Sequence, residues 1–469
     1  MSRINSNVDS LIAQNSLNKT NKALGVALTR LSTGVRVNSG ADDPAALIGG
    51  EFFRQELSSI KSAITNSNRT NNVLTTADAA LGQISNLFED IKGVLTSSAN
   101  SGVLSNEEVE ANQAFIDSAL DSVDRIATNT QFAGKKLLDG SLSYQLSGIT
   151  YGSTGLQDIQ VNQFSGSAGT QIDVTYTTVA ARATADLAGF TTGNAQVSFQ
   201  VVGSRGAATV SLGATANATD LAAAVNAVSD VTGISASGTT LTSVDYGSDA
   251  FVTLRDITGG LVNSATAITG NEFTDTGVDA AGTIEGQAFN GKGLNATLRT
   301  AGLDISIEFG ATATAGGSFN FTINGGGTQF QLGQEINAAG QLNLGIRSFS
   351  SASLGTNAIG RLDTLRSGST NDLSSGNFNT AGQILESATN QVSTARARLG
   401  AIQKNTLETN VSALQVAFEN ITASRSALID TDFAQETANL TRLQIVAQAG
   451  TSALSIANSR PQNVLSLLG

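Results

Sequence analysis

The chain has 469 residues and a net charge of −12 at pH 7, and it contains no Cys, no His and no Trp. A chain of this length is expected to form two or more domains. Without Cys or His, the usual ligands of zinc, copper, haem and iron–sulfur clusters are missing, so we expect no metal and no cofactor. The residues for Ser-His-Asp and Cys-His catalysis are also missing, so we expect no enzyme of these classes.

The acidic charge lies mainly in the middle of the chain. Between Ser141 and Ser348 there are 6 Lys or Arg residues against 15 Asp or Glu residues, and the remainder is close to neutral. Near-neutral ends can pack against copies of themselves, while an acidic middle keeps an outer surface solvated. There is no basic stripe and no run of about 20 apolar residues, so we expect neither nucleic-acid binding nor membrane insertion.

The first third of the chain predicts three helices. The first covers about Val8 to Thr33, and the second runs from Pro44 to about Asn100 with Asp43 as its N-cap. A proline suits the first helical position because its missing N–H would be unpaired there in any case. Gly49-Gly50 is a place where the second helix can loosen.

The third helix is expected to follow Ser105, because Glu108 three positions later completes a capping box. It ends before Thr130, and its apolar stripe contains Ile116, Leu120, Val123 and Ala127.

The middle alternates apolar and polar residues, which favours strands bounded by Gly. Examples are Val197–Val201, Ala250–Leu254 and Phe319–Ile323. A short helix from Leu221 to Val228, capped by Thr219 or Asp220, interrupts them, so an α+β module is expected. Asn324-Gly325 is typical of a type I′ hairpin turn.

Two more helices are expected near the end. One covers about Thr380 to Asp430, and its apolar spacing skips one residue between Ile402 and Leu407, which predicts a local change of winding. The last covers about Phe433 to Asn458 and stops at Pro461, because proline cannot donate the helical hydrogen bond.

Both ends carry the narrow apolar stripe of a coiled-coil seam, in steps of three and four residues. The stripe contains Leu24, Leu28, Leu31, Val35, Leu74, Ala77, Leu81, Ile84, Phe88, Ile91 and Leu95 near the start, and Val411, Leu414, Phe418, Ile421, Leu428, Leu440, Leu443, Ala447, Gly450, Leu454 and Ala457 near the finish. Each stripe needs a partner helix, from the other terminus or from a neighbouring molecule. The fold class is therefore α+β and multidomain, with a long antiparallel helical coiled-coil bundle from both termini and a β-rich inserted middle.

Several chemistry-bearing motifs have simpler structural interpretations. Asp42-Asp43 is read as a helix cap in preference to a catalytic carboxylate pair, since Pro44 follows directly. Lys135-Lys136 is interpreted as a surface hairpin pair. Gly325-Gly326-Gly327 is not followed by Lys-Ser/Thr and a helix, so it predicts a turn and no phosphate loop.

Four segments resemble bacterial flagellins. Ser32–Ala45 resembles their N-terminal signature, and Phe132–Gly140 is similar to the hairpin after their third helix. Gln448–Leu454 and Pro461–Gly469 are similar to the flagellin C-terminus. The matching flanks span about 1–155 and 330–469, and 197–257 resembles a small module inserted in some flagellin middles.

This resemblance implies a subunit that polymerises into the flagellar filament and serves swimming motility. It implies an extracellular protein, exported unfolded by the flagellar export apparatus without a cleaved signal peptide, with a flagellin chaperone, hook-associated proteins and cap proteins as partners. Residues 1–44 and 430–469 would form the filament core, 45–165 and 326–429 a helical rod with the β-hairpin, and 166–325 the variable outer region.

The resemblance also assigns roles to the seam residues. Those expected to drive core assembly are Leu24, Leu28, Leu31, Leu440, Leu443, Leu454, Leu465 and Leu468. Those expected to pack the rod are Leu74, Leu81, Ile84, Phe88, Ile91, Leu95, Val411, Leu414, Phe418 and Ile421.

One segment departs from the strongly immunostimulatory flagellins, which carry a basic stretch midway along the second helix that a Toll-like flagellin receptor contacts. The corresponding stretch here contains Glu89, Asp90 and Gly93, with Asp90 where Arg is expected and Gly93 where Glu is expected. An anion in place of a cation turns attraction into repulsion, so weak receptor activation is predicted.

Three alternatives remain at this stage. A hook–filament junction protein shares terminal sequence with flagellins, although the ending Pro461–Leu468 favours flagellin. A protease in the middle, found in some flagellins, needs a His-Glu-x-x-His site that a chain without His cannot provide. An adhesive outer surface is compatible with a flagellin.

Overall fold

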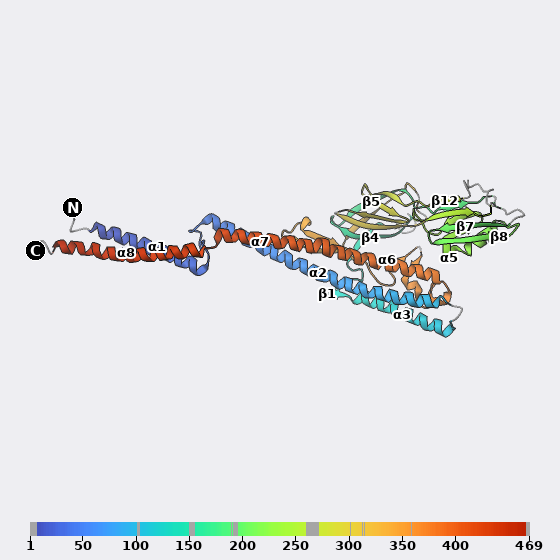
Figure 1. The fold of residues 1–469 in the computed structure, drawn as a ribbon, viewed down its shortest axis with the longest axis horizontal. Helices are drawn as coiled ribbons and strands as arrows, with labels where there is room; N and C mark the ends of the chain where they lie inside the picture. The colour runs from blue at the N-terminus through green and yellow to red at the C-terminus, as the bar shows by residue number, and fades with distance from the viewer. Residues whose placement is uncertain are drawn as a thin grey trace. The chain divides into compact units, whose positions relative to one another are not determined.

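The computed structural model describes residues 7–100, 104–149, 155–188, 190, 196–258, 272–300, 302–311, 313, 315–357 and 359–465, and the side chains of these as far as residue 460. Helices from both ends flank a β-rich middle, so the predicted fold class is confirmed (Figure 1). The chain forms two compact units. Unit 1 contains Met1–Asn68, Leu332–Gly340 and Glu408–Gly469, and unit 2 contains Arg69–Gln331 and Gln341–Leu407.

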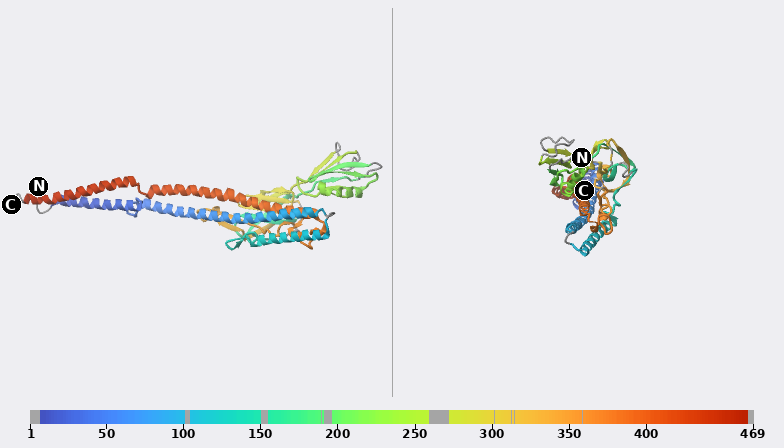
Figure 2. Two further views of the ribbon diagram at one scale, coloured as in Figure 1. Left: turned by 60° about the horizontal axis from the view of Figure 1, so that its bottom comes forward. Right: turned by 90° about the vertical axis from the view of Figure 1, so that its right-hand side faces the viewer.

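In unit 1, helix α1 (Val8–Thr33) pairs with helix α8 (Phe433–Leu465). The pairing is antiparallel, because Asn7 at the start of α1 bonds to Ala457 near the end of α8. Figure 2 shows the two helices side by side in its left view. The predicted first helix is confirmed at both ends, and it ends at Gly34, whose left-handed φ of 74° is typical of a helix C-terminus.

Helix α2 (Pro44–Ser98) begins where the sequence predicts. Asp43 caps it, its Oδ1 accepting from the Ala46 N–H at 3.0 Å. The helix is continuous through Gly49-Gly50, so the expected loosening is absent. These glycines instead allow close packing. A Cβ at Gly49 would lie 2.9 Å from Leu428 Cδ2, and one at Gly50 would lie 2.8 Å from Ile429 Cγ2.

The penultimate predicted helix is two α-helices joined by a different winding. Helix α6 (Phe378–Ile402) and helix α7 (Thr409–Ile429) flank a π-helical turn, Gln403–Glu408. A π-helical turn adds one residue to the helix, which is what a one-residue skip in the apolar spacing requires. It brings Leu407 to a buried position, so the predicted change of winding is confirmed.

The predicted end of the last helix is wrong. Helix α8 does not stop before Pro461 but runs through it to Leu465. A proline inside a helix leaves the carbonyl four residues earlier without its usual donor, here that of Ala457. The Asn7 Nδ2 supplies that donor at 2.8 Å, so the broken helical bond is replaced from α1.

The helices of unit 2 pack through large apolar side chains. The second half of α2 contributes to this unit, as do helix α3 (Asn106–Asn129) and α6. Ser105 and Glu108 form the predicted capping box at the start of α3. The predicted stripe of α3 is buried along its whole length: Ile116, Leu120, Val123 and Ala127.

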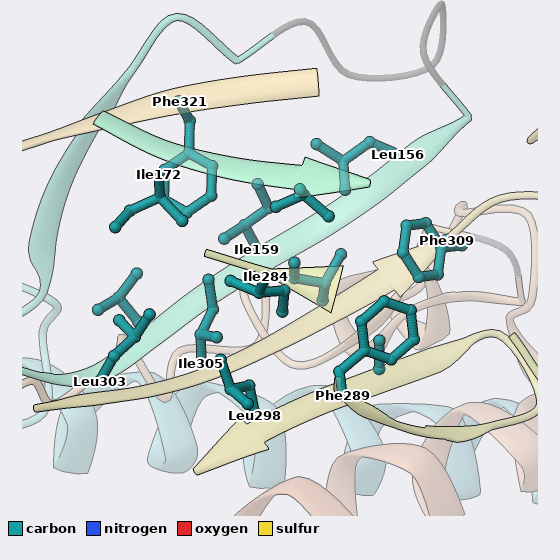
Figure 3. Close-up of a cluster of buried hydrophobic side chains, with 14 of the residues drawn as sticks. Leu156, Ile159, Ile172, Ile284, Phe289, Leu298, Leu303, Ile305, Phe309 and Phe321 are labelled. Carbon is teal, nitrogen blue, oxygen red and sulfur yellow. The ribbon is translucent and has the colours of Figure 1, made fainter. Parts of the chain in front are cut away.

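Two antiparallel sheets form the first β module, in the orders β14-β13-β5-β18-β3 and β15-β16-β17-β4. Its strands are β3 (Tyr144–Ser147), β4 (Leu156–Phe164), β5 (Thr170–Thr178), β13 (Ala281–Ile284), β14 (Gln287–Ala288), β15 (Asn290–Lys292), β16 (Asn295–Arg299), β17 (Leu303–Phe309) and β18 (Ser318–Gly326). The inward side chains of the two sheets form one apolar cluster that contains Ile172, Ile305, Phe309 and Phe321 (Figure 3).

The second β module contains two sheets, in the orders β12-β11-β7-β8 and β6-β10-β9, and two short helices. Its elements are β6 (Thr184–Asp186), β7 (Val197–Gly203), β8 (Gly206–Leu212), α4 (Ala218–Asn226), α5 (Ser229–Thr232), β9 (Ile234–Ser237), β10 (Thr240–Ser243), β11 (Phe251–Asp256) and β12 (Glu272–Thr276). The expected α+β module and its helix are therefore present.

The cap of α4 differs from the prediction. Asn217, and not Thr219 or Asp220, is the N-cap, because its Oδ1 accepts from the N–H groups of both those residues. Asp220 closes the capping box by accepting from the Asn217 N–H at 3.0 Å.

Short hairpins complete unit 2: β1 (Gln131–Phe132) with β2 (Lys135–Lys136), β19 (Thr328–Gln331) with β20 (Gln341–Leu344), and β21 (Gly355–Thr356) with β22 (Gly360–Arg361). Lys135-Lys136 thus lies in the predicted hairpin. Asn324-Gly325 is not a hairpin turn, and that prediction is wrong. Both residues lie inside β18, where a bulge between Ile323 and Gly325 absorbs the irregularity.

The glycines of α2 give a prediction about helix packing. Gly50→Ala is expected to destabilise the protein by about 1–3 kcal/mol, because the new methyl group overlaps Ile429. Gly93→Ala in the same helix has open space around it, so it is expected to stabilise by up to about 1 kcal/mol. Hydrogen exchange of the amides near each position measures both effects. Equal stabilisation by the two substitutions would contradict the packing argument.

Candidate assembly surface

The contact between α1 and α8 follows a heptad on both helices. On α1 the half-buried or buried positions recur in steps of three and four: Ser10, Ala13, Leu17, Thr20, Leu24, Ala27 and Leu31. On α8 they include Leu440, Leu443, Ala447, Gly450, Leu454 and Ala457. The α8 positions are those of the predicted stripe. On α1 the seam passes through Ala27, where the sequence stripe had Leu28.

The predicted core-assembly residues have different environments. Leu443 is 7% exposed, and Leu24, Leu31, Leu440 and Leu454 are half-buried along the seam. Leu28 is 48% exposed. The side chain of Leu465 and the whole of Leu468 lie outside the described residues.

Large apolar side chains also lie on the faces of α1 and α8 that point away from the seam. They are exposed in this structure of one chain: Val8, Leu11, Ile12, Val26 and Leu28 on α1, and Ile445, Val446 and Ile456 on α8. Exposed apolar side chains in such number mark a surface for further packing. Most of them lie outside the predicted seams, because each predicted seam is a single stripe on its helix. A second stripe of apolar residues beside the first on each helix is the sequence signal that could have identified them.

A backbone joint ties the α1–α2 connection to the α7–α8 connection. Val35 and Asp430 form an antiparallel bridge. The Arg36 N–H donates to the Ile429 carbonyl at 2.7 Å, and the Thr431 N–H donates to the Gly34 carbonyl at 3.0 Å. These bonds join the connection between α1 and α2 to the connection between α7 and α8. The pair α1/α8 is therefore attached to the rest of unit 1 at this joint.

Asp42 and Asp43 in the α1–α2 connection have separate local roles. The Asp42 carboxylate accepts from the Ser39 hydroxyl at 2.9 Å and from the Ser39 and Asn38 N–H groups. These bonds, that of the Ser39 hydroxyl first, hold the pKa of Asp42 below its usual value. Asp43 caps α2. The two carboxylates therefore shape the turn and do not face a shared site.

The predicted rod-packing residues fall in both units. Those on α2 are buried in unit 2: Leu74, Leu81, Ile84, Phe88, Ile91 and Leu95. Those on α7 are half-buried in unit 1: Val411, Leu414, Phe418 and Ile421. Glu89, Asp90 and Gly93 of the predicted receptor region are exposed on α2, beside the buried Phe88 and Ile91.

Charged residues occupy the polar face of β4 and β17 in unit 2. Glu308 stands opposite Asp158 on the neighbouring strand, and Asp158 lies 3.9 Å from the Arg347 guanidinium. Burial and the nearby Asp158 carboxylate raise the pKa of Glu308 from 4.5 to about 7, against the opposing effect of Arg347 and Arg361. The Glu308 carboxyl group therefore stays protonated up to near-neutral pH.

Polar contacts also connect this face and the second module to α6. Asp304 of β17 forms an ion pair with Arg398 of α6 and accepts from Asn162 Nδ2 at 3.3 Å. Asn379 at the start of α6 donates to Asp230 of α5 at 2.7 Å. Both β modules thus contact α6 through hydrogen bonds or charges.

Among the described residues there is no group of three or more His, Cys, Asp or Glu side chains suited to a metal ion. Over the same residues, none of the helices combines the length and apolarity that crossing a bilayer requires. The structural features that point to a function are therefore the paired terminal helices and their exposed apolar faces.

Comparison with known proteins finds similarity along the whole chain. Residues 4–143 match the bacterial flagellin N-terminal helical region, and residues 383–468 match the bacterial flagellin C-terminal helical region. A flagellin of Salmonella muenchen is 30% identical over 515 residues, and one of Salmonella rubislaw is 31% identical over 524 residues; each alignment covers 99% of both chains. The crystal structure of Xanthomonas campestris FlgL aligns at 14% identity with a TM-score of 0.30, covering 79% of this chain and 98% of that one.

The Glu308 site gives a pH prediction. The folded state binds this proton more tightly than the unfolded state, so its contribution to stability is present below pH 4.5 and is lost as the pH rises through about 7. The free energy of unfolding of the first β module should fall by up to about 3 kcal/mol over this range. Glu308→Gln should reduce the dependence, whereas exposed Glu272→Gln should leave it unchanged.

Tyrosine fluorescence during urea unfolding measures this effect, because all four tyrosines lie between residues 144 and 246 and the chain has no Trp. A module equally stable at pH 5 and pH 8 in the wild-type protein would contradict the prediction.

Proposed function

This chain belongs to the bacterial flagellin family and is a structural subunit of the flagellar filament, and we propose that its paired helices α1 and α8 are the part that polymerises. The exposed apolar faces of the pair support this proposal most directly. Ile445 and Ile456 are 64% and 63% exposed, and such side chains gain about 1.5–3 kcal/mol each when they are fully buried.

The proposed core comprises residues 1–44 and 430–469, where Leu24, Leu28, Leu31, Leu440, Leu443, Leu454, Leu465 and Leu468 drive assembly. The exposure of Leu28 supports contacts between subunits, whereas the burial of Leu443 supports a role in holding α1 against α8. The seam would position the two helices, and the outer faces would then bind neighbouring copies.

We assign residues 45–165 and 326–429 to a helical rod and 166–325 to the outer region. The buried α2 and α3 stripes support the first assignment. The acidic charge of the middle supports the second, since charge keeps a filament's outer surface solvated.

The hook–filament junction protein is the less supported alternative, because the curated relatives of this chain are flagellins over their whole length. Flagellin is a structural protein family, and we propose that this chain has no catalytic activity and needs no cofactor. The absence of His and Cys from the sequence supports this for metal-dependent and triad chemistry.

We further propose an extracellular location in the filament, reached through the flagellar export apparatus without a cleaved signal peptide. The proposed partners are other copies of the chain, a flagellin chaperone, and the hook-associated and cap proteins. Nucleic acid and a membrane are not among the partners we propose, and the acidic net charge of the chain supports the omission of nucleic acid.

The outer face of α8 gives the test of assembly. Ile445→Asp should raise the protein concentration needed for seeded filament growth at least about tenfold, because one buried apolar contact of 1.5–3 kcal/mol is lost. Gln444→Asp, at the neighbouring exposed position, is the control for charge. Electron microscopy and sedimentation measure the filaments. Normal growth of the Ile445 variant would contradict the role of this face.

The receptor region gives a second test. Purified monomer should activate cells that carry the Toll-like flagellin receptor weakly, because exposed Asp90 repels a site that suits a cation. Asp90→Arg should increase the response several-fold, whereas Glu51→Arg makes the same change of charge at another exposed position of α2 and should not. A strong response to the unmodified protein would show that the prediction is wrong.

A further inference from the structure

A second group of exposed apolar side chains lies in unit 1, away from α1 and α8. Ile48 and Phe52 on α2 are 73% and 65% exposed, and their spacing of four residues places them side by side on one face of the helix. They line a shallow hollow together with Glu51, Arg54, Gln55 and Ser58. This α2 hollow is therefore apolar and is bordered by charged and polar side chains.

The α2 hollow lies on the face of the helix that points away from α7. Gly50 packs closely against Ile429 of α7, and it is two residues from both Ile48 and Phe52. Two residues turn an α-helix by about 200°, so Gly50 is on the opposite side of α2 from the hollow. The hollow consequently stays open to solvent in this structure of one chain.

The loop between β19 and β20 holds a large apolar side chain out into solvent. Ile336 in this loop is 92% exposed. The loop is closed at its base, because the N–H groups of Leu332 and Gly333 both donate to the Gly340 carbonyl at 2.8 Å. The base is also attached to α7, since Asn410 Nδ2 donates to the Leu332 carbonyl at 3.0 Å. Ile336 is thus presented by an anchored loop of unit 1.

The loop and the hollow suit each other in shape and in chemistry. A filament made of one kind of subunit needs contacts between two different surfaces of the chain, because a surface that binds only its own copy closes a pair. This chain is a subunit of such a filament. A protruding apolar tip and an apolar hollow are two surfaces of this kind, and neither is complementary to itself.

The charges beside the two surfaces are also complementary. Glu335 precedes Ile336 in the loop, and Arg54 borders the hollow. Arg54 donates to Glu51 through Nε at 2.9 Å and through Nη2 at 2.6 Å. A guanidinium has five donors, so the exposed Arg54 can bind a second carboxylate as well.

We propose that the α2 hollow of one subunit receives the Ile336 loop of a neighbouring copy in the filament. Ile336 then packs against Ile48 and Phe52, and Glu335 pairs with Arg54. The proposal rests on the proposed role of this chain in assembly, and it adds a second interface to that of α1 and α8.

Ile336→Asp tests the contribution of the loop to assembly. It should raise the protein concentration needed for seeded filament growth about tenfold, because an apolar contact is lost and an anion enters the hollow beside Glu51. Gln334→Asp adds the same charge at another exposed position of the loop and should have little effect. Ile336→Val keeps an apolar tip and should grow almost as the unmodified protein does. Normal growth of the Ile336→Asp variant would overturn the proposal, as would an equal loss in the Gln334 variant.

Introduced cysteines report the contact directly, since the chain has no native Cys. Gln55→Cys borders the hollow and Gln334→Cys lies two residues from Ile336, so the double variant keeps all the proposed contact residues. A short thiol-to-thiol crosslinker should convert its filaments into a ladder of oligomers on a denaturing gel, because each subunit reacts with two neighbours. Each single variant should stay monomeric, and so should the control pair Gln334→Cys with Lys61→Cys, an exposed position elsewhere on α2.

A ladder no stronger than that of the control pair would overturn the proposal. Dimers from Gln55→Cys alone would also overturn it, because they would show that the hollow meets its own copy. Either result in filaments that grow normally leaves the proposed role of α1 and α8 standing, and seeded growth of the Ile445 variant tests that role separately.

Discussion

The contact between α1 and α8 is thin, and the behaviour of both chain ends depends on this. Among the described residues of the two helices, Ala27, Leu443 and Ala457 are buried, and two of these are alanines. The other leucines of the seam stay half-buried, so the seam removes little apolar area from water and contributes little stability by itself. The large apolar side chains lie on other faces, where only another molecule can cover them. Assembly thus provides the burial that the pair alone does not.

Unit 2 has the opposite balance. The inner face of α2 is buried through Leu74, Leu81 and Ile84, and each β module has its own apolar cluster. These parts satisfy their apolar surface within one chain and have no comparable need of a partner. Within unit 1, by contrast, the backbone joint at Val35 and Asp430 bonds the α1–α2 connection to the α7–α8 connection beside the thin α1/α8 seam.

Patterns that depend on local spacing were predictable, and features that depend on distant partners were not. The skip between Ile402 and Leu407 predicted a local change of winding, and the structure has a π-helical turn there, because burial of Leu407 requires one extra residue. The end of α8 was mispredicted because Asn7, 450 positions earlier, replaces the bond that Pro461 removes. Asn324-Gly325 resembled a hairpin turn, but pairing of β18 with β3 and β5 overrode that preference. The outer apolar faces were missed because one stripe per helix seemed sufficient to explain helical packing.

The attachment of the β modules to α6 differs in kind from the packing inside them. Asp304 meets Arg398 and Asp230 meets Asn379, whereas the module cores are built from Ile, Leu, Val and Phe. Polar contacts at a surface require matched partners at few positions and add little to the stability of either side. Each module can therefore fold on the strength of its own core, and its connection to the helix depends on a few charge and amide pairs. This separation allows a β-rich middle to vary while the helices that carry it keep the packing that assembly requires.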